Sequence, residues 1–193
     1  MKLFINSGIC KRIWNGNGNV KIKQPLGKSQ IHLFIPNYLE DEKKEENIKF
    51  VFNNIKGLSK ESLKNRLLIY PEHFWLLVKD DKIISFINGM VTDDVTISDE
   101  MFENADLHNP QGNYQAIFGV DTLPEYQKRG FAGKLMEVLI KEARDQGRKG
   151  CILTCKKELL PFYEKFGYIN NGVSKSVHGG AVWYDMKLEF KNE

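Results

Sequence analysis

The amino-acid sequence predicts an α/β (α+β) protein in which helices flank a mixed, mostly antiparallel sheet. Two apolar runs, at residues 74–78 and 83–91, flank a polar turn and are typical of an antiparallel hairpin. A strand, helix, strand, helix order follows over residues 114–166, and two further strand patterns end the chain. A strand–helix–strand unit adds parallel strands to a sheet that otherwise pairs antiparallel, so we expect a single domain of this class.

The first part of the chain is predicted to form strands and two helices. Asn-Gly pairs within residues 15–19 indicate a turn. We assign residues 1–30 to an N-terminal extension, either a hairpin or an arm, and residues 31–193 to the main domain. The elements expected before the hairpin are a strand at residues 31–35 and helices at residues 38–52 and 59–68, the latter with Leu63, Leu67 and Leu68 on one face.

The second half of the chain contains the clearest helical pattern. Residues 92–113 form a polar loop whose length is often associated with function. Residues 130–146 then predict a helix that ends at Gly147, with Phe131, Leu135, Val138, Leu139 and Ala143 on one face. The other elements expected here are strands at residues 114–121, 151–154, 168–173 and 181–190 and a helix at residues 157–166.

Composition excludes several classes of partner. The chain has 193 residues, enough for one domain with a sizeable core, and its formal net charge of +3 is too small to indicate nucleic-acid binding. No apolar run approaches the roughly 18 residues that a membrane span requires, and no signal-peptide pattern is present. The three cysteines form neither a disulfide framework nor a set of metal ligands. We therefore expect a cytoplasmic protein with no membrane partner and no bound metal.

A glycine-rich turn at residues 127–133 is the strongest candidate for a binding site. It lies between a predicted strand and a predicted helix, where backbone N–H groups and the helix dipole favour an anion. Small residues at this position also suit a helix that packs closely on a sheet, and the pattern alone leaves both interpretations open. The residues expected to hold phosphate oxygens are Lys128, Arg129, Gly130, Phe131, Ala132, Gly133 and Lys134.

Two motifs resemble those of a known superfamily. Residues 127–132, Gln-Lys-Arg-Gly-Phe-Ala, resemble the (Gln or Arg)-x-x-Gly-x-(Gly or Ala) pattern of the GNAT N-acetyltransferases. Residues 160–168 resemble the Phe-Tyr-x-x-x-Gly-Phe pattern of their late helix, and the order of elements agrees. Within the superfamily the chain is most similar to the arylalkylamine (serotonin) N-acetyltransferases and their bacterial relatives.

This resemblance implies that acetyl-CoA is the cosubstrate and that its acetyl group passes to a primary amine of a small molecule by direct attack on the thioester. The turn would hold the pyrophosphate, and the central strand would pair with the pantetheine arm. Besides the turn, the residues expected to bind the cosubstrate are Phe118, Gly119, Val120 and Cys155. We expect a monomer or a homodimer. The alternatives are an acyl-CoA-binding or sensing protein without turnover and an unrelated phosphate-binding α/β enzyme.

The resemblance also suggests catalytic residues, with one departure. Tyr163 matches the tyrosine that lies near the CoA sulfur in the family, and we interpret it as the general acid; the alternative is an aromatic side chain that packs on the sheet. The serotonin enzymes carry two histidines on the central strand, whereas residues 114–118 have none.

His178 is the first candidate for the general base in place of these histidines, because imidazole titrates near neutral pH. It lies in a polar, glycine-containing loop, and the alternative is an exposed histidine without a role. A water relay from Tyr114 or Gln115, or the carboxylate of Asp121, are further candidates for the base. His108 is expected on a loop surface, although it could line the acceptor site.

Overall fold

The fold is taken from a computed structural model. It describes residues 6–7, 10–14, 20–26, 29–35, 60–79 and 82–191. The helix predicted at residues 38–52 and the turn predicted at residues 15–19 lie outside these ranges.

All strands in the described part of the chain belong to one sheet, in the order β1-β2-β3-β4-β5-β6-β7-β8-β10-β9. The chain divides into two compact units, and four elements contribute residues to both: α2 (Lys60–Ile69), β6 (Lys82–Thr92), β7 (Tyr114–Thr122) and α3 (Phe131–Asp145). The first unit comprises Met1–Lys56, Arg66–Asn88 and Gly119–Leu135, and the second comprises Gly57–Asn65, Gly89–Phe118 and Met136–Glu193.

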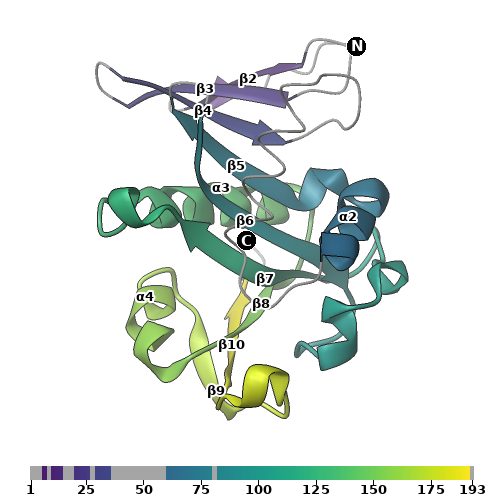
Figure 1. The fold of residues 1–193 in the computed structure, drawn as a ribbon. Coiled ribbons are helices and arrows are strands. Elements are labelled where there is room, and N and C mark those ends of the chain that lie inside the picture. The colour runs from purple at the N-terminus through teal and green to yellow at the C-terminus, as the bar shows by residue number, and fades with distance from the viewer. Residues whose placement is uncertain are drawn as a thin grey trace. The chain divides into compact units, whose positions relative to one another are not determined.

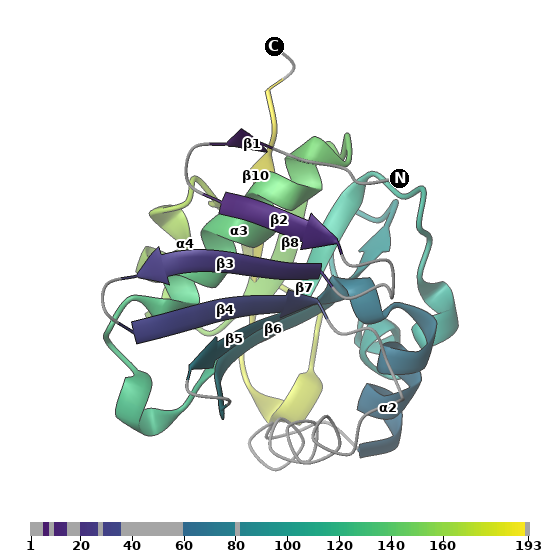
Figure 2. The same ribbon diagram turned by 90° about the horizontal axis from the view of Figure 1, so that it is seen from above.

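The first unit contains a run of antiparallel strands. Consecutive strands from β1 to β6 pair with one another, and β2 to β5 lie side by side in Figure 2. The predicted hairpin is confirmed as β5 and β6, and the strand expected at residues 31–35 begins at Ser29 and crosses the boundary proposed at residue 30. The remaining strands of this unit are β1 (Asn6–Ser7), β2 (Cys10–Trp14), β3 (Val20–Leu26), β4 (Ser29–Ile35) and β5 (Phe74–Lys79).

Helix α2 (Lys60–Ile69) corresponds to the predicted helix at residues 59–68. Leu63 and Leu67 are buried as expected, but Leu68 is 49% exposed. At about 100° per residue, Leu68 lies about 140° around the helix from Leu63, whereas Arg66 lies only about 60° from it, so Leu68 falls outside the buried face. Arg66 is buried instead, and its Nη1 donates to Asn88 Oδ1 at 3.3 Å.

The second unit contains the parallel pair of the sheet. β7 pairs in parallel with β8 (Gly150–Cys155) from Tyr114↔Gly150 to Ile117↔Leu153, the first four residues of a nine-residue strand. β10 (Tyr184–Glu189) pairs antiparallel with both β8 and β9 (Ile169–Val173), and Figure 1 shows the three strands adjacent. The predicted mixed, mostly antiparallel sheet is therefore confirmed.

Helix α3 follows the predicted pattern closely. Phe131, Leu135, Leu139 and Ala143 are buried, and Gly147, with φ of 75°, lies just beyond the end of the helix. Met136 is also fully buried although the sequence pattern did not include it, and Val138 is only half-buried. The apolar face is thus rotated slightly from the predicted one.

The helix predicted at residues 157–166 is shorter in the structure. A 3-10 turn, η5 (Lys157–Leu159), precedes the five-residue α4 (Leu160–Glu164). Pro161 has no N–H to donate back into the preceding turn, so a regular α-helical hydrogen bond cannot form there. Gly167, with φ of 88°, lies beyond the far end. Among the described helices, none has the length and apolar composition required to cross a bilayer.

Candidate active site

The predicted phosphate-binding turn belongs wholly to the first unit. It follows β7 and the 3-10 turn η4 (Pro124–Tyr126) and leads into α3. Lys128 and Gly130 both have left-handed backbones, with φ of 57° and 81°. Backbone that includes such left-handed residues turns successive N–H groups toward one side, an arrangement that binds anions. The first N–H groups of α3 have no acceptor within the helix, so they add to the same site.

Aromatic rings hold the cationic side chain of this turn. The Arg129 guanidinium carbon lies 5.3 Å from the Tyr126 ring centroid and 5.5 Å from that of Phe131. A guanidinium that stacks by its flat face keeps its N–H donors free in the plane. Gln127 Nε2 donates to Thr122 O at 3.1 Å, which ties the turn to the end of β7. The two rings thus lie beside the Arg129 guanidinium, and the glutamine links the turn to β7.

The end of β7 is fixed by contacts with β6. Ser85 Oγ donates to Asp121 O and lies within hydrogen-bonding distance of Thr122 Oγ1, both at 2.8 Å. Burial raises the pKa of Asp121, opposed by the hydrogen bond that its Oδ1 accepts from Thr122 N at 2.7 Å. A Cβ at Gly119 would lie 3.0 Å from Asn88 Nδ2, so the strand comes close to its neighbour there.

Tyr163 is buried in the second unit against other aromatic side chains. It lies on α4 and is 6% exposed, with Phe162 and Tyr168 at ring-centroid distances of 5.0 and 5.9 Å. Burial raises the pKa of Tyr163, and the neighbouring Cys155 adds to this effect. Burial likewise raises the pKa of Cys155 to about 11. Both groups are therefore protonated near neutral pH, as a general acid at Tyr163 requires.

Alternation along β8 places Tyr163 on one face of the sheet. Cys151 and Cys155 share that face, because Tyr168 forms a hydrogen bond with Cys151 and Tyr163 lies near Cys155. Ile152 and Thr154 face the other way. The second unit therefore has a face beside α4 and an opposite face, which we call the open face and define by Ile152 and Thr154 of β8.

His178 is held on a cluster of aromatic rings. It begins the 3-10 turn η6 (His178–Gly180), and its ring stacks on Phe102 at 5.4 Å with an interplanar angle of 20°. Phe102 in turn contacts Phe118 at 4.9 Å, and Trp183 Nε1 donates to His178 O at 2.8 Å. We call Phe102, Phe118, His178 and Trp183 the aromatic cluster. The prediction that His178 lies in a loop is confirmed, and the structure adds that its ring is packed.

Asp99 connects this loop to a segment far away in sequence. It begins η2 (Asp99–Phe102), and its carboxylate accepts hydrogen bonds from Ser176 Oγ and, at 3.1 Å, from Val177 N. The hydrogen bond from Ser176 lowers the pKa of Asp99, and the nearby His178 contributes to this. Sequence reasoning missed Asp99 because no local pattern links residues 77 positions apart.

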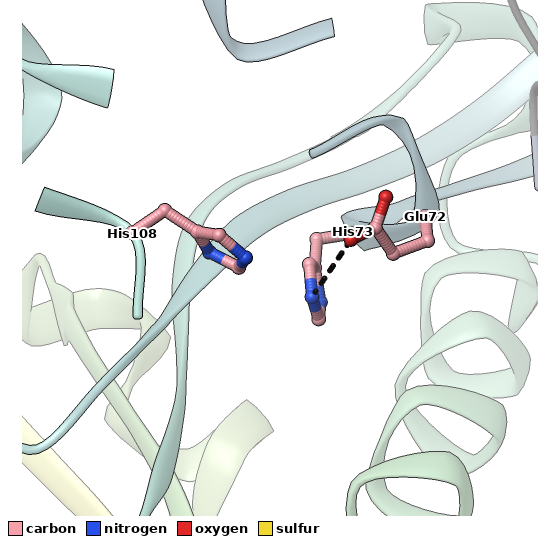
Figure 3. Close-up of side chains that lie close together, drawn as sticks. All are labelled: Glu72, His73 and His108. Atoms are coloured by element: carbon pink, nitrogen blue, oxygen red, sulfur yellow. Dashed lines mark ion pairs between the residues drawn. The ribbon is translucent and has the colours of Figure 1, made fainter. Parts of the chain in front are cut away.

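Two other histidines lie in settings that the sequence did not reveal. His73 is 3% exposed, and its Nε2 lies 3.8 Å from Glu72 Oε1, an ion pair drawn in Figure 3, which also labels His108 of the second unit. His108 Nδ1 accepts a hydrogen bond from Val91 N at 3.1 Å, and the side chain is half-buried in its loop. Burial lowers the pKa of His108 to about 4, and the positive charge of Arg148 acts in the same direction.

This setting of His108 predicts a loss of stability in mild acid. The unfolded chain binds a proton near pH 6.5 and the folded chain only near pH 4, so stability falls as pH drops through this range. Partial exposure of the imidazole reduces the effect of its pKa shift on stability. We expect protonation of His108 to lower the free energy of unfolding by about 2 kcal/mol. The amide oxygen of His108→Gln can still accept from Val91 N. Urea unfolding should show that the free energy of unfolding falls between about pH 7 and about pH 4.5 by about 2 kcal/mol less in this variant than in wild type. An equal acid loss in both proteins would contradict the buried, neutral imidazole.

Gln115 and Tyr114, the other candidates for a proton relay, are engaged in structural contacts. Gln115 Nε2 donates to Met90 O at 2.8 Å and to Ala116 O at 2.9 Å. Lys187 Nζ lies 4.8 Å from the centroid of the Tyr114 ring. The described contacts therefore give Gln115 a role in joining β6 to β7.

The mixed sheet and the strand–turn–helix site define a class of α/β protein, the GNAT fold. The model of the Acetyltransferase (GNAT) family matches residues 34–168, and the chain belongs to this family. It is thus an acetyl-CoA-dependent acyltransferase with acetyl-CoA as cosubstrate. Strands β5 to β10 and helices α2, α3 and α4 form the single GNAT domain predicted from the sequence.

Solved structures support the same fold. Ard1 from Thermoplasma volcanium has a TM-score of 0.61 at 13% identity, covering 86% of this chain and 100% of that one. The loading GNATL domain of CurA from Lyngbya majuscula has a TM-score of 0.64 at 14% identity, covering 82% and 97%. Arabidopsis thaliana Naa50, solved with the bisubstrate analogue CoA-Ac-MVNAL, has a TM-score of 0.59 at 12% identity, covering 83% and 99%. At such low sequence identities, the structural similarity shows the fold alone. Membership of the arylalkylamine branch remains a prediction.

Proposed function

We propose that the chain transfers the acetyl group of acetyl-CoA to a primary amine of a small molecule. The observation that carries this proposal is the turn at residues 127–133, in which two left-handed residues, a helix N-terminus and Arg129 combine in a member of the GNAT family. The backbone N–H groups of this turn would hold the pyrophosphate. The backbone of Phe118, Gly119 and Val120 would pair with the pantetheine arm as an added strand does.

The reaction forms a C–N bond and breaks a C–S bond. The neutral amine nitrogen attacks the thioester carbonyl carbon, and the CoA sulfur leaves with the bonding electron pair. The nitrogen then releases one further proton to water as the amide forms. Tyr163, whose hydroxyl burial keeps protonated, donates to that sulfur. The ammonium loses its proton to His178, which the stack on Phe102 and the contacts of Asp99 with the preceding residues hold in place.

Release of free CoA thiol in the presence of an amine panel tests the proposal. The panel should contain aryl amines, alkyl amines, diamines and short peptides, since Naa50 was solved with a peptide-bearing analogue. Release with an amine and not with water supports amine acetylation. Binding of acetyl-CoA with no release for the whole panel would instead support the alternative, an acyl-CoA-binding protein on the same fold.

Arg129→Ala should weaken the binding of acetyl-CoA more than the binding of the amine acceptor. Loss of a charge-assisted hydrogen bond costs about 1.5 to 3 kcal/mol, so we expect the KM for acetyl-CoA to rise about tenfold or more. Lys141→Ala is the control, because Lys141 is exposed on α3 and pairs with Asp145 at 2.6 Å. An unchanged KM for acetyl-CoA in Arg129→Ala would show that this side chain does not contact the phosphates.

A further inference from the structure

The long polar loop between β6 and β7 is joined at its two ends. Asp93 and Asn113 are its first and last residues, and Asp93 Oδ1 accepts from Asn113 N at 3.1 Å. Asp93 Oδ2 accepts from Asn109 Nδ2 at 2.7 Å, and Arg148 Nη1 donates to Gly112 O at 2.7 Å. Loops whose ends are held together in this way frequently carry a function. The middle of this loop therefore starts and finishes at fixed points within the second unit.

The middle of the loop, the 3-10 turn η2, contacts the loop that carries His178 at two points. At the first residue of η2, the Asp99 carboxylate accepts hydrogen bonds from Ser176 Oγ and from Val177 N, the latter at 3.1 Å. At its last residue, the Phe102 ring stacks on the His178 ring at 5.4 Å. One short turn thus holds both the backbone before His178 and the face of its ring.

A chain of hydrogen bonds connects Asp99 to His178 itself. Ser176 Oγ donates to the Asp99 carboxylate, and the same oxygen accepts from His178 N at 3.4 Å. A hydroxyl has one proton and two lone pairs, so donation to the carboxylate leaves its oxygen free to accept. Ser176 N also donates to Ser174 Oγ at 3.2 Å, and both serines are buried. The carboxylate therefore orients the hydroxyl, and the hydroxyl meets the backbone of His178.

The imidazole of His178 is held without the use of its nitrogens. The hydrogen bonds that the structure describes for His178 involve only its backbone N and O, and the ring is held by its face on Phe102. A general base needs a nitrogen that can take the proton of the substrate. The next two residues, Gly179 and Gly180, have left-handed backbones with φ of 62° and 65°, and glycine is conformationally free. Contacts from outside this loop are therefore needed to keep His178 in one place.

We propose that Asp99 is the positioning residue of the general base, and that it holds the His178 ring through Ser176 and Val177. This inference rests on the amine acetylation proposed above. A misplacement of about 1 Å can cost about 10²-fold in rate, so contacts that never touch the substrate can still set kcat. The long loop between β6 and β7 thereby supports the base. Asp99 makes and breaks no covalent bond.

A double-mutant cycle with His178 tests this role. In the wild-type background, Asp99→Ala should lower kcat for amine acetylation about tenfold and leave the KM for acetyl-CoA unchanged, because the cosubstrate turn belongs to the first unit. In the His178→Ala background, the same substitution should lower kcat by less than about twofold, since no base remains to be positioned. Asp99→Asn keeps one oxygen that accepts, so it should retain more activity than Asp99→Ala. An equal loss in both backgrounds, or no loss in either, would overturn the proposal.

Asp106→Ala is the matched control for Asp99→Ala. It removes the same charge from an exposed residue of the same loop, in the 3-10 turn η3 (Ala105–Leu107). An exposed side chain away from such contacts has little effect when it is replaced, so kcat should stay within about twofold of wild type.

A second measurement does not depend on turnover. The Phe102 ring should shift the ring protons of His178 upfield in the proton NMR spectrum, and His178→Ala identifies their signals among the four histidines of the chain. In Asp99→Ala these signals should move toward those of an unstructured histidine, whereas Asp106→Ala should leave them in place. If wild-type protein acetylates no amine, the proposed function fails, and this comparison decides separately whether Asp99 holds the ring. Unchanged His178 signals in Asp99→Ala would overturn the proposal.

Discussion

Replacing Tyr163 with phenylalanine is expected to lower kcat by about 10²-fold or more, the range typical of a lost general acid. Phenylalanine keeps the ring that packs against Phe162 and Tyr168, so the fold and the KM for acetyl-CoA should change little. The loss arises because no hydroxyl remains to donate to the leaving sulfur. Steady-state rates of thiol release over a range of pH measure it directly.

Tyr168→Phe is the control for this substitution. Tyr168 is equally enclosed, with 2% exposure, and its hydroxyl donates to Met136 Sδ at 3.8 Å. Its removal should cost about 1 kcal/mol of stability and leave kcat nearly unchanged. Burial raises the pKa of Tyr163, so its deprotonation should not limit the rate near neutral pH. If Tyr163→Phe retained full turnover at every pH, the ring would be a packing residue only.

The largest effect on stability is expected from Gly89→Ala in β6. An added Cβ would lie 1.8 Å from Ala116 O and 2.9 Å from Ala116 C, both backbone atoms of β7. A backbone carbonyl in a strand cannot rotate away as a flexible side chain can, so the two strands must separate. We expect a loss of about 3 kcal/mol or more in the free energy of unfolding, at the upper end for an overpacked site.

Thermal unfolding should show this loss as a fall in Tm of about 6 to 12 °C, given about 2 to 4 °C per kcal/mol for a chain of this size. Gly172→Ala serves as the comparison. It has φ of 100°, and an added Cβ meets nothing within 4 Å, so only the left-handed backbone opposes it. That cost is about 1 to 2 kcal/mol. A Gly89→Ala protein with the same Tm as wild type would contradict the close approach of β6 to β7.

Local patterns predicted the secondary structure well where periodicity is strong. Helix α3 lies within one residue of its expected bounds, because apolar spacing and Gly147 specify both its face and its end. The length of α4 was overestimated, because Pro161 disrupts the first turn although the apolar spacing there is helical. The prediction for Leu68 failed for a similar reason, because one residue of rotation separates a buried side from an exposed one.

The sequence by itself determined the fold class and predicted the turn that would hold the cosubstrate, since both depend on neighbouring residues. Residues 127–133 have a glycine, cations and a helix start in consecutive positions, and such a site is local. Tertiary structure decided what stands beside the proposed base. Asp99 lies 77 residues before Ser176, whose hydroxyl donates a hydrogen bond to its carboxylate. Contacts across a sheet depend on strand order and register, which no local pattern encodes.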